Sequence, residues 1–138
     1  MGRIIAIDYG RKRTGIAVTD PDRIIASPLS TVPTHELIGF LTKYIEEEGV
    51  DCLVIGEPKQ MDYTASEAEK YIAPFIKQVS KSFPDLKIER VDERFTSRMA
   101  LQVILESGIS KKGRRDKSLI DKISAAIILQ TYLEMNNG

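Results

Sequence analysis

The sequence has little of the chemistry on which many enzymes depend. It contains one cysteine, Cys52, so neither an internal disulfide nor a cysteine-built zinc site can form. It contains one histidine, His35, which argues against a Ser-His-Asp hydrolase and excludes a metal site built from several histidines. Any catalytic chemistry must therefore come from carboxylates, lysines, arginines or hydroxyls.

Long apolar runs and an excess of charge of one sign are also missing. No apolar run approaches the roughly 18 residues of a membrane span, and the N-terminal sequence MGRIIAIDYG has no signal-peptide core. Twenty Lys and Arg residues balance twenty Asp and Glu residues, which excludes a uniformly basic nucleic-acid coat protein. We expect a single α/β domain over residues 1–138 that is cytoplasmic and does not bind membranes.

Three short strands are expected in the first thirty residues, at 3–7, 14–19 and 23–27. The segments between them, 11–13 and 20–22, are short, and the second is an Asp-Pro-Asp turn signal. Connections of this length join only antiparallel neighbours. The beginning of the chain is therefore predicted to be a three-stranded antiparallel meander.

Helices and strands alternate in the rest of the chain. Thr34 is expected to cap the first helix, and Gly49 is expected to end it. The second helix contains Pro74, where we expect a kink. The elements expected after the meander are a helix from 34, a strand at 51–56, a helix from about 64 to 83, a strand at 87–91, and helices at 96–107 and about 118–135.

This order predicts a mixed five-stranded sheet, in which the meander is joined by parallel strands and helices cover both faces. The two most apolar strands, around Ile5 and Val54, are expected at the centre of the sheet. In sheets of this kind, ligands bind beyond the carboxyl ends of the parallel strands.

Acidic residues stand at the ends of three strands that should run parallel: Asp8, Glu57 and the pair Asp92-Glu93. One acid at a strand end is usually a turn residue. Several acids at one edge repel one another, and a divalent cation relieves that repulsion. Oxygen ligands without His or Cys suit Mg²⁺ or Mn²⁺, so the sequence indicates such a site.

Asp121, near the start of the last helix, has two interpretations. It can form a capping box with Ser118, which holds the first turn of the helix. Alternatively, it points toward the strand ends as a further metal ligand. The spacing of the sequence does not separate the two interpretations.

Positive charge is concentrated in two segments that flank these acids in the chain. Arg11, Lys12 and Arg13 follow the first strand directly, and a second basic segment spans residues 111–117. Such a segment is either a solvated surface loop or a surface that binds phosphates. The basic residues of the second segment are Lys111, Lys112, Arg114, Arg115 and Lys117.

Four motifs in the chain resemble those of the YqgF (RuvX) family, in the same order. They are DYGRKRTGIA at 8–17, GEPKQMD at 56–62, DERFTS at 92–97 and DKISAA at 121–126. The resemblance runs from about residue 3 to residue 134. Members of this family are assigned as Holliday junction resolvases and as nucleases for the 5′ end of pre-16S rRNA. The resemblance implies a ribonuclease H-like fold, which agrees with the element order read from the sequence.

The resemblance also implies an acidic triad, which falls on Asp8, Glu93 and Asp121. These carboxylates would bind two Mg²⁺ or Mn²⁺ ions, about 3.5–4 Å apart, for phosphodiester hydrolysis. Arg94 would orient Glu93 or contact a phosphate, and the two basic segments would hold the nucleic-acid backbone without reading bases.

The chain departs from the family's pattern at two positions of the second motif. Glu57 replaces a leucine and adds an acid near the site, which makes it a candidate accessory ligand. Tyr63 replaces a glycine that would ease a tight turn. Both changes concern the loop after the strand and do not touch the triad.

The expected function is that of a hydrolase acting on ester bonds, an endonuclease that processes the 5′ end of pre-16S rRNA in ribosome biogenesis. Resolution of Holliday junctions is one alternative, and a non-catalytic RNA-binding assembly factor is another. Asp-x-Gly after a first strand also resembles the phosphate loop of actin-like ATPases, which need two such domains. The sequence does not choose between RNA and DNA, and it is compatible with a monomer or a weak homodimer.

Overall fold

The computed structural model describes residues 2–57, 69–92 and 117–137, and this part contains a mixed five-stranded sheet. The first three strands form the predicted antiparallel meander, and the last two run parallel to the first. The strand order is β3-β2-β1-β4-β5, so the two most apolar strands lie centrally, as predicted. The strands are β1 (Arg3–Asp8), β2 (Arg13–Thr19), β3 (Ala26–Pro33), β4 (Val50–Glu57) and β5 (Lys87–Asp92).

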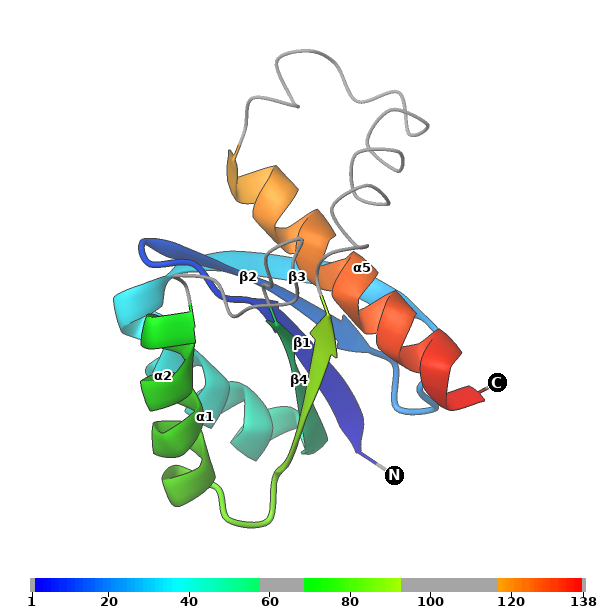
Figure 1. Cartoon of the computed structure of the whole chain (residues 1–138). Helices are drawn as coiled ribbons and strands as arrows, with labels where there is room; N and C mark the ends of the chain where they lie inside the picture. The colour runs from blue at the N-terminus through cyan, green and yellow to red at the C-terminus, as the bar shows by residue number, and fades with distance from the viewer. Residues whose placement is uncertain (1, 58–68, 93–116, 138) are drawn as a thin grey trace.

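Helices cover both faces of this sheet (Figure 1). The 3-10 turn η1 (Thr34–Glu36) leads into α1 (Leu37–Glu48), which lies with α2 (Glu69–Ser82) on one face. The long helix α5 (Lys117–Asn137) lies across the other face. The α/β fold class predicted from the sequence is confirmed, whereas the helix expected at 96–107 lies outside the described residues.

Burial of β1 on both faces explains its unbroken apolar sequence. Ile5 and Ile7 pack in one cluster with side chains of α1 and α2, while Ile4 and Ala6 pack in a second cluster with side chains of α5. All four are at most 3% exposed. Successive side chains of a strand point to opposite faces, so a strand covered on both sides needs apolar residues throughout.

The start of α1 differs from the prediction, because Thr34 does not cap it. The helix begins at Leu37 after the 3-10 turn, and its N-cap residue makes no side-chain capping bond. The Thr34 hydroxyl instead donates to the carbonyl oxygen of Gly10 at 2.6 Å, and its N–H donates to the carbonyl oxygen of Lys12 at 3.0 Å. Thr34 thus fastens the turn after β1 to the end of β3. The helix ends at Gly49 as predicted, with a φ of 73° that favours glycine.

The third strand begins later than predicted. Residues 23–27 were expected to form it, yet β3 begins at Ala26. The Asp20 carboxylate accepts hydrogen bonds from the N–H groups of Ile24 and Ile25 at 2.8 and 2.7 Å, and these bonds lower the pKa of Asp20. Both isoleucines are therefore held in the turn, 69% and 61% exposed, because bonding to a nearby carboxylate competes with strand pairing.

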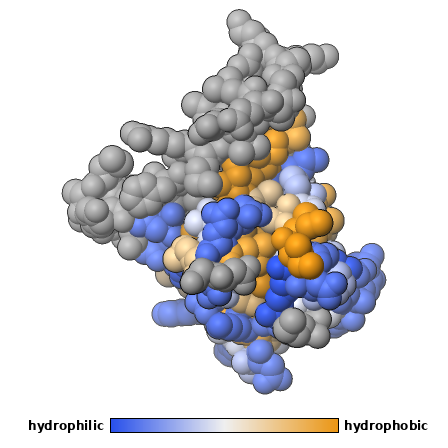
Figure 2. Space-filling view, turned by 90° about the vertical axis from the view of Figure 1, so that its right-hand side faces the viewer, coloured by the Kyte–Doolittle hydropathy of each residue, from blue (hydrophilic) through white to orange (hydrophobic). Residues whose placement is uncertain are grey.

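Apolar side chains also reach the surface, where Figure 2 shows them grouped between polar regions on one face of the molecule. The exposed large apolar residues of the described part include Ile24, Ile25 and Met135. Among the helices that the structure describes, none has the length and apolar character needed to cross a membrane.

Replacing Ile55 with alanine tests the central position of β4. Ile55 is 0% exposed, and its loss should lower the free energy of unfolding by about 2–5 kcal/mol, because burial is lost and a cavity remains. Ile24→Ala makes the same chemical change at an exposed site and should stay within about 0.5 kcal/mol of the wild type. Urea unfolding measures both, and equal effects of the two changes would contradict the assignment of the core.

Candidate active site at the carboxyl edge of the sheet

The carboxyl ends of three neighbouring strands place acidic residues along one edge of the sheet. Asp8 ends β1, Glu57 ends β4 and Asp92 ends β5, and all three are half-buried. Glu57 and Asp92 are direct partners in the pairing of β4 with β5. Ile7 pairs with Ile55, so Asp8 lies one residue beyond that pair, at the same edge. The edge therefore gathers acids that are far apart in the sequence.

Gly15 allows Asp121 to approach this edge. In the pairing of β1 with β2, Gly15 is the direct partner of Asp8. A Cβ added at Gly15 would collide with the backbone carbonyl of Asp121, in the first turns of α5. Only a residue without a side chain lets the helix backbone come this close to the strand. The helix consequently crosses β2 beside Asp8.

An ion pair holds the Asp121 side chain. Arg13 Nε donates to Asp121 Oδ2 at 2.7 Å, and the two side chains are 39% and 22% exposed. Arg13 stands at the start of β2, so the pair joins the sheet to α5 and neutralises the charge of Asp121. The carboxylate thus faces the sheet edge, and Arg13 contacts an acid in this structure.

The turn after β1 also rests on α2. The ring of Tyr9 packs against that of Phe75, with 5.0 Å between the centroids and 39° between the planes. The guanidinium of Arg11 lies over the ring of Tyr71, with its Cζ 4.4 Å from the centroid. Burial raises the pKa of Tyr9, so its phenol is protonated at neutral pH. Tyr71 and Phe75, which are four positions apart on α2, thus contact Arg11 and Tyr9 of the turn after β1.

Arg90 fixes the beginning of α2 to the end of β4. Its guanidinium donates to the carbonyl oxygens of Ile55 at 3.2 Å and Gly56 at 3.1 Å, and it forms an ion pair with Glu69 at 2.5 Å. The ion-paired side chains are 24% and 20% exposed. The sequence patterns did not indicate Arg90 or Tyr71, and the only signal for Tyr71 was its helical spacing from Phe75.

Comparison with known proteins gives the family. The sequence model for RuvX, described as a Holliday junction resolvase, matches residues 2–135 of the chain. The chain belongs to the RuvX family. This membership confirms the resemblance found in the sequence motifs.

Individual RuvX relatives are similar over nearly their whole length. A Bacteroides fragilis protein is 57% identical over 134 residues, and a Porphyromonas gingivalis protein is 58% identical over 134 residues. In both comparisons the match covers 97% of this chain and 97% of the relative. Both relatives carry the name "Putative pre-16S rRNA nuclease".

Solved structures show the same fold. Thermus thermophilus RuvC in complex with a Holliday junction substrate superposes with a TM-score of 0.60 at 16% identity, covering 98% of this chain and 96% of that one. A second T. thermophilus RuvC structure gives a TM-score of 0.61 at 15% identity, covering 97% and 96%. The RuvX chain therefore has the ribonuclease H-like fold that the resemblance to the family implied.

The structure gathers the described members of the predicted site at one end of this RuvX fold. In the part of the chain that the structure describes, no group of three or more His, Cys, Asp or Glu side chains is arranged to hold a metal ion. Asp8, Glu57 and Asp121 line the strand ends, and Arg11, Lys12 and Arg13 lie in or next to the turn after β1. Lys117 begins α5. The predicted residues outside the described ranges are Glu93, Arg94, Lys111, Lys112, Arg114 and Arg115, together with Tyr63.

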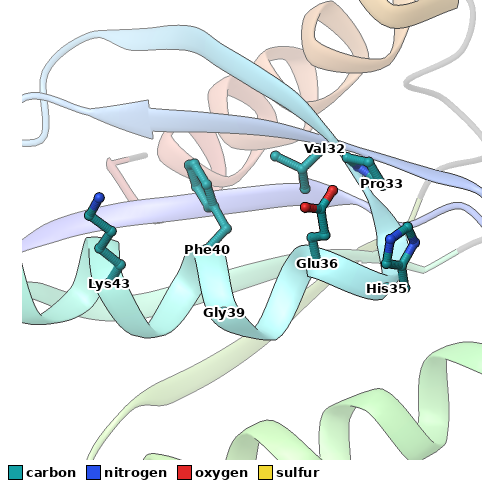
Figure 3. A pocket seen from close by; sticks show the side chains of 7 residues that line it. All are labelled: Val32, Pro33, His35, Glu36, Gly39, Phe40 and Lys43. Carbon is teal, nitrogen blue, oxygen red and sulfur yellow. The ribbon is translucent and has the colours of Figure 1, made fainter.

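A separate groove lies between β3 and α1 (Figure 3). Glu36 points from η1 toward Val32 of the strand, and Phe40 and Lys43 lie further along, on α1. None of the predicted site residues lines this groove. Its acidic and basic side chains oppose each other in sign, so it does not select an anion by charge.

Replacing Gly15 with alanine tests whether close approach of α5 organises the RuvX site. The added methyl group meets the Asp121 backbone, so α5 must shift, and we expect a loss of about 1–3 kcal/mol in the free energy of unfolding. Gly39→Ala is the matched control, since nothing lies within 4 Å of its added Cβ and alanine favours the helix. Thermal and urea unfolding should show opposite signs for the two changes, and a neutral Gly15→Ala variant would refute the close approach.

Proposed function

We propose that this RuvX protein is a metal-dependent endonuclease that hydrolyses phosphodiester bonds in structured nucleic acid. The observation that carries the proposal is the juxtaposition of Asp8 and Asp121, on either side of Gly15, beside the basic turn after β1. Family membership supports it, because the curated relatives are named as nucleases. The acids supply ligands for a cation, and the basic turn supplies contacts for phosphates.

Carboxylates are the proposed metal ligands. Asp8, Glu93 and Asp121 hold Mg²⁺ or Mn²⁺, and Glu57 serves as an accessory ligand. The donor set fits these ions, because it contains only oxygen atoms, and two of its members, Asp8 and Glu57, end neighbouring parallel strands. A carboxylate has two oxygens, so Asp121 can serve a metal ion while Arg13 is bonded to one of them.

The chain's own residues position the substrate in this mechanism. When bound, the metal ions activate a water molecule as the nucleophile and stabilise the leaving oxygen. Asp8 would present its carboxylate to the metal ion from a rigid backbone, because β1 is packed on both faces. Arg11 and Lys12 hold the backbone of the nucleic acid by charge, which positions it without reading its bases. Further backbone contacts are proposed for Arg94, Lys111, Lys112, Arg114, Arg115 and Lys117.

The proposed substrate is the 5′ leader of pre-16S rRNA. The support is the name shared by relatives that are 57% and 58% identical over 97% of the chain. A DNA four-way junction is the second candidate, favoured by the description of the family and by the fold shared with RuvC. Contacts to the backbone alone do not distinguish these substrates, so the choice depends on shape.

Cleavage of both substrates by wild type and Asp8→Asn tests the proposal. Each substrate is incubated with Mg²⁺, with Mn²⁺ and with a chelator. We expect metal-dependent cleavage of the RNA leader that falls more than about 100-fold in Asp8→Asn, since the change removes a charged metal ligand. Asp85→Asn is the matched control, because Asp85 is exposed in the loop before β5, at the opposite end of that strand, and its loss should leave cleavage unchanged.

The other outcomes of this experiment have distinct meanings. Preferential cutting of the DNA junction would replace the RNA substrate with the second candidate. If neither substrate is cut, and the affinity for RNA is the same with and without metal, the nuclease proposal is refuted. The protein would then be a non-catalytic RNA-binding protein.

A further inference from the structure

Tyr71 is an exposed aromatic residue with a specific partner in the basic turn. It lies on α2 and is 41% exposed, although large apolar side chains are usually covered. The guanidinium of Arg11 lies over its ring at 4.4 Å, within the range of a cation–π interaction. Arg11 follows Asp8 by three positions, so this contact lies at the rim of the acidic edge.

Both partners of this contact are held by other interactions. On α2, Glu69 is paired with Arg90 two residues before Tyr71, and Phe75 packs against Tyr9 one helical turn after it. On the other side, Thr34 bonds to the backbone on either side of Arg11, at the carbonyl oxygens of Gly10 and Lys12. The ring and the backbone of Arg11 therefore keep a fixed relation to each other and to β1.

The neighbouring base in the turn lacks this arrangement. Lys12 is exposed like Arg11. Of these two bases, only Arg11 contacts an aromatic ring in the part of the chain that the structure describes. A long side chain on an exposed turn has many rotamers, and binding a phosphate costs the entropy of ordering it. A ring that holds the guanidinium in advance reduces that cost. Stacking uses the face of the guanidinium, and its N–H donors lie in its plane, where they can meet a phosphate in a forked geometry.

We propose that Tyr71 is a positioning residue that holds Arg11 ready to bind a backbone phosphate of the nucleic acid at the acidic edge. The inference rests on the proposed function for the identity of the ligand. It adds to that function a residue on a different element, which acts on substrate binding through Arg11 and does not contact the metal site.

RNA binding to the full-length wild-type chain and its variants tests this inference, with the pre-16S leader as the probe and a chelator present. Tyr71→Leu should weaken binding about 2- to 5-fold, the size of a cation–π contact at an exposed site. Tyr71→Phe keeps the ring and should bind like wild type. In an Arg11→Gln background, Tyr71→Leu should have no further effect, because the side chain that it positions is gone.

Lys12→Gln provides the matched control. Lys12 is a base of the same turn without the ring contact, so its effect and that of Tyr71→Leu should multiply. The dependence of affinity on salt gives a second readout, which a purely structural role of Tyr71 would not change. Removing one interaction with a phosphate makes the slope of log K against log salt shallower by about 0.7 to 0.9. We expect the slope of Tyr71→Leu to move toward that of Arg11→Gln.

The outcomes separate this inference from the nuclease itself. If the losses of RNA affinity caused by Tyr71→Leu and Arg11→Gln multiply in the double variant, the inference is overturned, even if cleavage remains metal-dependent and requires Asp8. Absence of RNA binding in the chelator would also overturn it, since contacts between a guanidinium and a phosphate need no metal. Coupled effects in a chain that binds RNA but does not cleave would support the role of Tyr71 and refute the nuclease.

Discussion

The absence of a side chain at Gly15 is the constraint on which the site depends. Asp8 must lie at the end of a strand buried on both faces, and its partner on β2 is Gly15. Because this position carries only hydrogen, the backbone of α5 comes directly onto the strand and brings Asp121 to the same edge. A larger residue would separate a central strand from the helix that covers it. The packing of the core and the geometry of the acids are thus set by the same contact.

Electrostatics explains how a protein without a net charge can hold several acids at one edge. Three strand ends carry carboxylates there, and their mutual repulsion would disfavour folding if nothing opposed it. Arg13 neutralises Asp121 through a direct ion pair, while the exposed bases Arg11 and Lys12 lie nearby in the chain. In the proposed enzyme, bound metal ions and these bases would both offset the negative charge of the acids. A bound cation therefore favours the binding of the negatively charged nucleic acid, and the nucleic acid favours the binding of the cation.

Local patterns predicted the elements but not the contacts that tie them together. Short turns predicted the meander, and Gly49 was correctly expected to end α1, because both depend on neighbours in the chain. The role of Thr34 was predicted wrongly, because its acceptor at Gly10 lies 24 positions away. Arg13 and its partner are separated by 108 positions, and no spacing rule reaches that far. The acids at the strand ends were recognised because an edge of a parallel sheet follows from the element order.

The turn after β1 and the start of β2 are attached to α2, to the 3-10 turn η1 and to α5 by three different kinds of contact. Rings join the turn after β1 to α2, backbone and hydroxyl hydrogen bonds join it to the 3-10 turn that leads into α1, and an ion pair joins β2, which continues from it, to α5. Ionic strength acts on these contacts unequally, because dissolved ions screen a half-exposed ion pair far more than packed rings or neutral hydrogen bonds. Concentrated salt therefore weakens the hold of Arg13 on the Asp121 carboxylate selectively, while the buried apolar contacts keep α5 packed on the strands.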